Sequence, residues 1–138
     1  MRIVADTNIV VSGILWNGNE RRLMDAARDG IIEIVSSPTL LGEFENVLSR
    51  PKFTSRLKLK NVELNFIVEA YSLLADIIIT KPLDTEVSRD FDDDEVLACA
   101  VAGDCDFVVT GDSDLLVLKE YRGIRIMRAA ELLLELNL

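Results

Sequence analysis

Apolar and polar positions follow one another along this chain in a way that predicts strands alternating with helices. Short continuous apolar runs indicate strands covered on both faces, because a half-exposed strand would be polar at every second position. These runs are Arg2–Ala5, Ile31–Val35, Asp76–Thr80, Asp106–Thr110 and Gly123–Met127. Longer stretches repeat apolar residues at helical spacing. They lie after Asp6-Thr7-Asn8, over Glu20–Asp29, after Ser36-Ser37-Pro38, and over Asn61–Leu74, Asp92–Ala102, Asp114–Lys119 and Ala129–Leu136.

This order of elements predicts an α/β fold, a three-layer α/β/α sandwich with a central, mainly parallel sheet of about five strands. Local signals support the predicted ends, since Gly30 suits the end of a helix and Ser37-Pro38 suits a capped start. The length of 138 residues suits one domain, and no internal repeat or linker rich in Pro, Gly or Ser divides the chain. We therefore expect a single domain over residues 1–138.

The composition excludes several classes of site. The chain has no histidine, which excludes Ser-His and Cys-His catalysis and leaves acid–base chemistry to carboxylates, lysine, tyrosine or metal-bound water. Its two cysteines, Cys99 and Cys105, match neither a zinc site nor a disulfide framework, so we expect buried free thiols. No apolar run approaches the roughly 20 residues of a membrane span, and Met1–Val4 leads into a strand without the layout of a signal peptide. We therefore expect a cytoplasmic protein.

Acidic residues follow the predicted strands, where functional groups gather in an open parallel sheet. Asp6 follows the first strand, Asp112 follows the Asp106–Thr110 strand, and the run Asp92-Asp93-Asp94-Glu95 begins a helix. Glu43 lies early in the helix after the second strand. Each has a structural alternative, because an aspartate at a strand-to-helix junction is a favoured helix cap worth about 1 kcal/mol and Glu43 suits a solvated surface.

Helical geometry separates the members of the acidic run. At about 100° per residue, Val96 and Leu97 lie on an inward face, and Asp93 points along the middle of it. Asp92 and Glu95, three positions apart, suit a capping pair and so have a sufficient structural role. An ionised carboxylate aimed at the sheet is costly unless a positive charge meets it, and this singles out Asp93.

Several acids at one edge of a sheet would repel one another unless divalent cations lay between them. The candidates for this edge are Asp6, Glu43, Asp93 and Asp112. Ligands that are all oxygen suit Mg²⁺ or Mn²⁺ rather than zinc. Such ions orient and activate a water for attack on phosphorus, so the pattern indicates hydrolysis of a phosphodiester without histidine.

The same residues carry a family resemblance that spans essentially the whole chain. Asp6-Thr7-Asn8, Ser37-Pro38 followed by Glu43, the acidic start before Val96-Leu97-Ala98-Cys99-Ala100, and Val109-Thr110-Gly111-Asp112 together resemble a PIN domain. Within that family the chain looks like the bacterial and archaeal toxins of toxin–antitoxin systems, relatives of the VapC ribonucleases. The resemblance implies a metal-dependent ribonuclease on a parallel sheet with helices on both faces.

The resemblance also implies roles for particular residues. Asp6, Glu43, Asp112 and one aspartate of the run would be the catalytic, metal-binding acids. Asp93 and Asp94 both fit the family pattern, and the helical-face argument favours Asp93. Four polar side chains would support the carboxylates without binding the metal. These are Thr7, Asn8, Ser37 and Thr110.

The net charge of −9 argues against a partner made of phosphates, but the distribution of charge permits one. Residues 84–114 hold eleven acids and one base, so the rest of the chain carries a net charge of +1. Residues 50–60, which we call the basic strip, contribute +5. Its bases are Arg50, Lys52, Arg56, Lys58 and Lys60.

The basic strip has two interpretations, a surface that contacts nucleic-acid phosphates or an ordinary solvated connection between helices. Trp16 and Phe53 could stack on bases, although packing or a contact between two copies of the chain suits either of them better.

We therefore expect a ribonuclease that uses a metal-activated water, with Mg²⁺ or Mn²⁺ as cofactor and single-stranded RNA as substrate. The resemblance implies an antitoxin protein as partner and a homodimer. One alternative is a phospho-aspartyl α/β domain, phosphatase-like or a receiver, although Asn8 stands where a phosphatase-like site needs a second aspartate. The other alternative is a non-catalytic PIN-like module that binds RNA or a partner.

Overall fold

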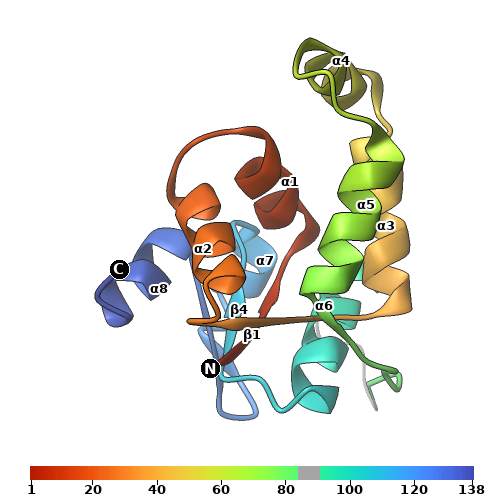
Figure 1. The fold of residues 1–138 in the computed structure, drawn as a ribbon. Coiled ribbons are helices and arrows are strands. Elements are labelled where there is room, and N and C mark those ends of the chain that lie inside the picture. The colour runs from red at the N-terminus through yellow and green to blue at the C-terminus, as the bar shows by residue number, and fades with distance from the viewer. Residues whose placement is uncertain (84–90) are drawn as a thin grey trace.

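The computed structural model describes residues 1–83 and 91–138, and side chains in those ranges except at residues 91–93. Within these ranges one sheet holds six strands in the order β3-β2-β1-β4-β6-β5 (Figure 1). The strands are β1 Arg2–Ala5, β2 Glu33–Ser36, β3 Asp76–Ile77, β4 Phe107–Val109, β5 Glu120–Tyr121 and β6 Ile124–Met127. Every neighbouring pair is parallel except β5 with β6. The predicted, mainly parallel sheet is confirmed.

Helices cover both faces of this sheet. They are α1 Thr7–Leu15, α2 Asn19–Arg28, α3 Pro38–Leu48, α4 Pro51–Leu59, α5 Leu64–Leu74, α6 Phe91–Ala102, α7 Ser113–Leu116 and α8 Ala129–Glu135. Alternate residues of β1 point to opposite faces, so Ile3 packs with the apolar sides of α1, α2, α5 and α8, while Val4 packs with those of α6 and α7. The three-layer α/β/α sandwich predicted from the sequence is the observed architecture.

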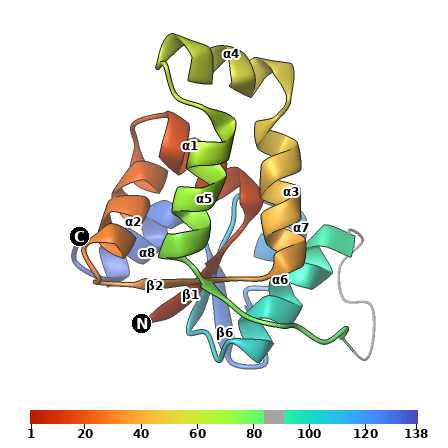
Figure 2. The ribbon, with the colours of Figure 1, turned by 45° about the vertical axis from the view of Figure 1, so that its right-hand side comes forward.

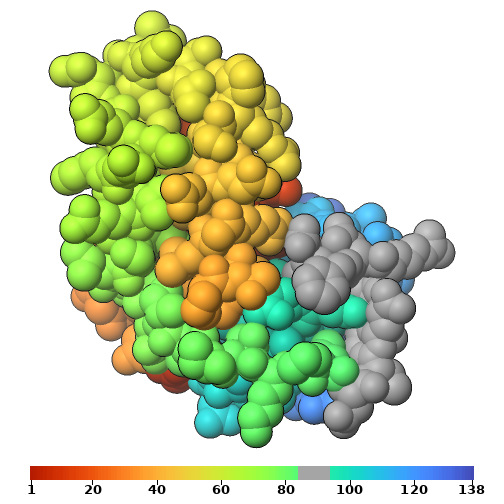
Figure 3. Space-filling view, turned by 90° about the vertical axis from the view of Figure 1, so that its right-hand side faces the viewer, coloured from red at the N-terminus to blue at the C-terminus, as the bar shows by residue number. Residues whose placement is uncertain are grey.

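Helices α3 and α5 lie side by side, and α4 crosses over their ends (Figure 2). The space-filling view shows α4 at the end of the arm that α3 and α5 form (Figure 3). The basic strip forms helix α4 with Pro51 in its first turn, an element that was not predicted from the sequence. Phe53 and Leu57, four positions apart, are its buried face.

The local signals for element ends are confirmed. Ser37 caps α3 by accepting a hydrogen bond from the Leu40 N–H at 3.2 Å, with Pro38 in the first turn. Gly30 follows the end of α2 with a φ of +76°, a conformation that glycine adopts without steric cost.

Two strands differ from the prediction. The third strand, expected over Asp76–Thr80, ends at Ile77, and Ile79 is 81% exposed because the chain leaves the sheet there. Strand β5 was not predicted. It pairs with β6 through a two-residue turn in which Arg122 and Gly123 have positive φ values of 50° and 81°. That geometry matches the twist of a tight hairpin, so a short polar segment becomes an edge strand.

Candidate active site

Asp6 lies where β1 ends and α1 begins. Its backbone N–H donates to the Val109 carbonyl at 2.9 Å, which continues the pairing of β1 with β4 by one residue. The residue is 9% exposed and occupies the N-cap position of α1, yet its side chain makes no capping hydrogen bond. Asp6 therefore does not cap α1 with its side chain. Its carboxylate instead accepts a hydrogen bond from the Thr110 hydroxyl at 2.9 Å.

Thr110 joins this carboxylate to Asp112. The Thr110 side chain is completely buried, and its Oγ1 accepts a hydrogen bond from the Asp112 N–H at 3.0 Å while donating to Asp6. A hydroxyl carries one hydrogen and two lone pairs, so it can perform both roles at once. The adjacent parallel strands β1 and β4 thus end in one hydrogen-bonded unit formed by Asp6, Thr110 and Asp112.

Asp112 also has the structural role that the sequence allowed. It is the N-cap of α7, and its Oδ1 accepts a hydrogen bond from the Asp114 N–H at 2.9 Å. Capping employs one oxygen of a carboxylate that has two, so a helix cap and a metal ligand are compatible roles for the same side chain.

The other predicted acids lie on helices α3 and α6. Glu43 is half-buried on α3, and Asp94 is half-buried in the first turn of α6. The side chains of Asp92 and Asp93 lie outside the described residues, as does the predicted capping by Asp92. Among the side chains that are described, no three acids or thiols lie close enough together to hold one metal ion.

Glu95 has contacts that the sequence did not reveal. Its Oε1 accepts hydrogen bonds from the hydroxyls of Ser37 at 3.1 Å and Thr80 at 2.8 Å. These donors follow β2 and β3, so Glu95 fastens the start of α6 to the edge of the sheet. The available signal was a hydroxyl residue after each of these two strands, but pairing them with Glu95 requires the topology.

The polar residues predicted to support the acids are placed differently. Thr110 supports Asp6 and Asp112 directly, whereas Ser37 supports Glu95 and caps α3. Thr7 is buried and Asn8 exposed, both in the first turn of α1.

The thiols are confirmed as buried and free. Burial raises the pKa of both Cys99 and Cys105 to about 12, so they stay protonated near neutral pH and are poor metal ligands and nucleophiles. Burial also raises the pKa of Tyr71 on α5. The chemistry available at the carboxyl edge of the sheet is thus that of carboxylate oxygens, which suit a hard divalent cation.

Comparison with known families decides the classification. The family model described as PIN domain matches residues 2–114. The chain belongs to the PIN-domain family. Searches of curated proteins and of solved structures gave no match. PIN domains are generally metal-dependent nucleases, and the matched span includes all five acids predicted as metal ligands.

The basic strip of this PIN domain packs on the end of α1. The Arg56 Nε and the Lys60 Nζ both donate to the Leu15 carbonyl, at 3.1 and 3.0 Å. Cations at the last carbonyls of a helix complement its dipole. Arg56 and Lys60, two of the five basic side chains predicted to bind RNA, therefore have a structural role. The remaining three, Arg50, Lys52 and Lys58, have exposed side chains.

Phe53 of the basic strip and the neighbouring Trp16 differ in exposure. Phe53 is 8% exposed, which confirms packing, and its ring meets that of Trp16 edge-on at 5.9 Å. Trp16 is 39% exposed.

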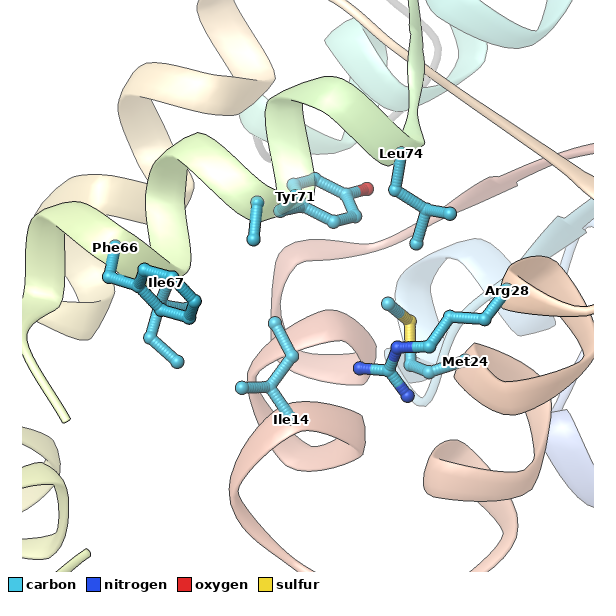
Figure 4. A pocket seen from close by; sticks show the side chains of 8 residues that line it. Ile14, Met24, Arg28, Phe66, Ile67, Tyr71 and Leu74 are labelled. Carbon is cyan, nitrogen blue, oxygen red and sulfur yellow. The ribbon is translucent and has the colours of Figure 1, made fainter. Parts of the chain in front are cut away.

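An apolar hollow of about 340 Å³ lies between α1, α2 and α5 of the PIN domain (Figure 4). Ile14, Met24, Phe66 and Leu74 line it, and the Arg28 side chain extends into it from α2. Among the residues that the structure describes, no carboxylate lines this hollow, which separates it from Asp6 and Asp112 at the sheet edge. Within the described part of the chain, no helix is long and apolar enough to cross a membrane.

Proposed function

We propose that this PIN-domain protein is a metal-dependent endoribonuclease that hydrolyses phosphodiester bonds of single-stranded RNA. The observation that carries the proposal is the hydrogen-bonded unit of Asp6, Thr110 and Asp112 at the carboxyl ends of two adjacent parallel strands, in which Asp6 and Thr110 are buried. Ligand sites of open α/β sheets lie at this edge. Family membership supports the nuclease class.

The donor set fits Mg²⁺ or Mn²⁺, because every candidate ligand is a carboxylate oxygen. Asp6, Glu43 and Asp112 would hold the cation together with Asp93 or Asp94. A divalent cation bound there supplies a water of lowered pKa and charge stabilisation for the leaving oxygen.

The described side chains have separate tasks in this proposal. Thr110 fixes the orientation of the Asp6 carboxylate and of the Asp112 backbone. Glu95, held by Ser37 and Thr80, positions the first turn of α6, which carries Asp93 and Asp94. Outer groups of this kind change metal affinity or activity by about 10- to 100-fold when removed.

The basic strip supports a phosphate-rich substrate. Arg50, Lys52 and Lys58 are exposed, and no acid interrupts residues 50–60. Such a cluster provides the electrostatic, sequence-independent part of nucleic-acid binding. RNA is favoured over DNA by the resemblance to VapC relatives.

The same resemblance supports a biological setting. We propose that residues 1–138 form one nuclease domain that acts in the cytoplasm. In this setting the chain would be the toxin of a toxin–antitoxin pair, a homodimer that an antitoxin protein inhibits.

Expression in a bacterial host tests this setting. The wild-type chain should arrest growth and the Asp6→Asn variant should not. Equal growth with both chains at equal expression would contradict the toxin role.

End-labelled RNA and DNA of identical sequence, each single-stranded and double-stranded, test the proposed activity in the presence of Mn²⁺. We expect cleavage of single-stranded RNA and much slower cleavage of the other three substrates. RNA that is bound but left intact would support the non-catalytic module instead. Covalent labelling of the chain by acetyl phosphate would support the phospho-aspartyl alternative.

A further inference from the structure

We infer that the exposed Trp16 ring is a stacking platform for an RNA base, at a distance from the cleavage site that helix α1 sets. This inference rests on the proposed ribonuclease activity and adds a subsite to it. Helix α1 has Asp6 at its N-cap and Trp16 at its C-cap. One rigid element therefore connects a candidate metal-binding acid to an exposed aromatic ring.

Two neighbours hold the Trp16 ring in place. Phe53 packs against it edge-on with an interplanar angle of 71°, and the Arg56 guanidinium lies over it at 5.1 Å from the ring centre. Arg56 is itself fixed by its hydrogen bond to the Leu15 carbonyl. A side chain held before binding loses little conformational entropy on contact, which favours affinity.

The charge around the ring favours nucleic acid as its occupant. Lys52 lies over the Phe53 ring at 4.8 Å, so both aromatic rings have a cation beside them. The loop from Trp16 to Asn19 is exposed and contains no acid, and neither does the basic strip. Surfaces that bind single-stranded nucleic acid usually combine aromatic side chains with lysine and arginine side chains.

The length of α1 sets the spacing between the two subsites. Trp16 lies ten positions after Asp6, and at a rise of about 1.5 Å per residue this corresponds to about 15 Å. A stacked strand advances about 3.4 Å per nucleotide, so the base on Trp16 would lie about four to five nucleotides from the scissile bond. Substrates shorter than this would lack the contact.

Trp16 is the only tryptophan of the chain, so its fluorescence reports on this one position. The test uses the Asp6→Asn variant to prevent cleavage and a single-stranded RNA of about ten nucleotides. We expect quenching of Trp16 emission on binding. In the same background, Trp16→Ala should weaken binding by about 5- to 100-fold, and Trp16→Phe by less, since a smaller ring still stacks.

An RNA of equal length and charge with abasic sites separates stacking from attraction to phosphates. We expect two equal affinities: that of abasic RNA for the chain with intact Trp16, and that of normal RNA for the Trp16→Ala chain. Lys52→Ala should reduce the salt dependence of binding by about one ion, whereas Trp16→Ala should leave that dependence unchanged. Equal affinity of abasic and normal RNA, or of the chains with and without Trp16, would overturn the inference.

Cleavage by the wild-type chain separates this inference from the proposed function. If the wild-type and Trp16→Ala chains cleave long RNA with the same KM, the stacking role of Trp16 is contradicted, while the proposed ribonuclease activity stands. Absence of RNA cleavage contradicts the proposed function. A contact between two copies of the chain would also overturn the inference. It would appear as a shift of Trp16 emission with protein concentration in the absence of RNA, together with a doubled mass in light scattering.

Discussion

Thr110 connects the two acids of the site through one hydroxyl group. It donates to the Asp6 carboxylate and accepts from the Asp112 N–H, and it is completely buried. A buried aspartate needs hydrogen bonds to remain ionised at low cost, and Thr110 supplies one in a fixed direction.

Thr110→Val keeps the shape of the side chain and removes the hydroxyl. We expect metal affinity or the cleavage rate to fall by about 10- to 100-fold, because Asp6 loses the group that orients it. Titration with Mn²⁺ and initial cleavage rates measure the effect. Thr110→Ser is the matched control, since it restores the hydroxyl and should recover most of the loss. A folded Thr110→Val chain with wild-type rates would contradict this role.

The buried cysteines lead to a prediction of how stability and thiol labelling depend on pH. Folding raises the pKa of Cys99 and Cys105 to about 12, above about 8.5 for an exposed thiol. The stability associated with the protonated thiols is therefore complete below about pH 8.5 and declines as pH rises toward 12. A thiol reagent at about pH 8 should label the native chain far more slowly than the urea-unfolded chain. Labelling of the native chain at the rate of free cysteine would show that the thiols are accessible and ionise readily.

At the scale of elements, the sequence predicts what local chemistry determines. Ser37-Pro38 and Gly30 mark helix ends because caps and positive φ values depend on neighbouring residues alone. Strand β5 and the early end of β3 depend on the sheet edge, which local periodicity does not contain. Helix α4 was not predicted, since only two of its side chains, Phe53 and Leu57, are buried.

The attachment of α4 to α1 leads to a prediction of stability. Arg56→Ala removes the hydrogen bond to the Leu15 carbonyl and the contact with Trp16. Because Arg56 is partly exposed, we expect the free energy of unfolding to fall by about 1 kcal/mol. Lys58→Ala, an exposed change on the same helix with the same loss of charge, should stay within about 0.5 kcal/mol of wild type. Urea denaturation compares the two, and equal values would show that the bond to Leu15 adds no stability.

At the scale of the whole molecule, charge is distributed unevenly. The net charge is −9, yet the basic strip is free of acids and residues 84–114 hold eleven of them. Asp6 and Asp112 were identified from their places after strands, since adjacent parallel strands end at one edge. The link between Glu95, Ser37 and Thr80 was missed, because it joins three segments that only the order β3-β2-β1 brings together.

A cation that binds the folded chain but not the unfolded chain should stabilise the whole molecule. At free Mn²⁺ about 100 times its dissociation constant, we expect a gain of about 2.7 kcal/mol in the free energy of unfolding. Asp6→Asn should lose most of this gain. Thermal unfolding with and without Mn²⁺ measures it, and an equal shift in both chains would show that the cation binds away from Asp6.

Cleavage of single-stranded RNA in Mn²⁺ or EDTA, by three chains in parallel, tests the central claim most directly. The chains are wild type, Asp6→Asn and Asp114→Asn, the last being an exposed residue of α7 that undergoes the same change of charge. We predict cleavage by wild type and Asp114→Asn in Mn²⁺, none in EDTA, and a loss of more than about 100-fold in Asp6→Asn, beyond the effect of an outer group. RNA left intact by the wild-type chain in Mn²⁺, or cut equally well by Asp6→Asn, would contradict the account.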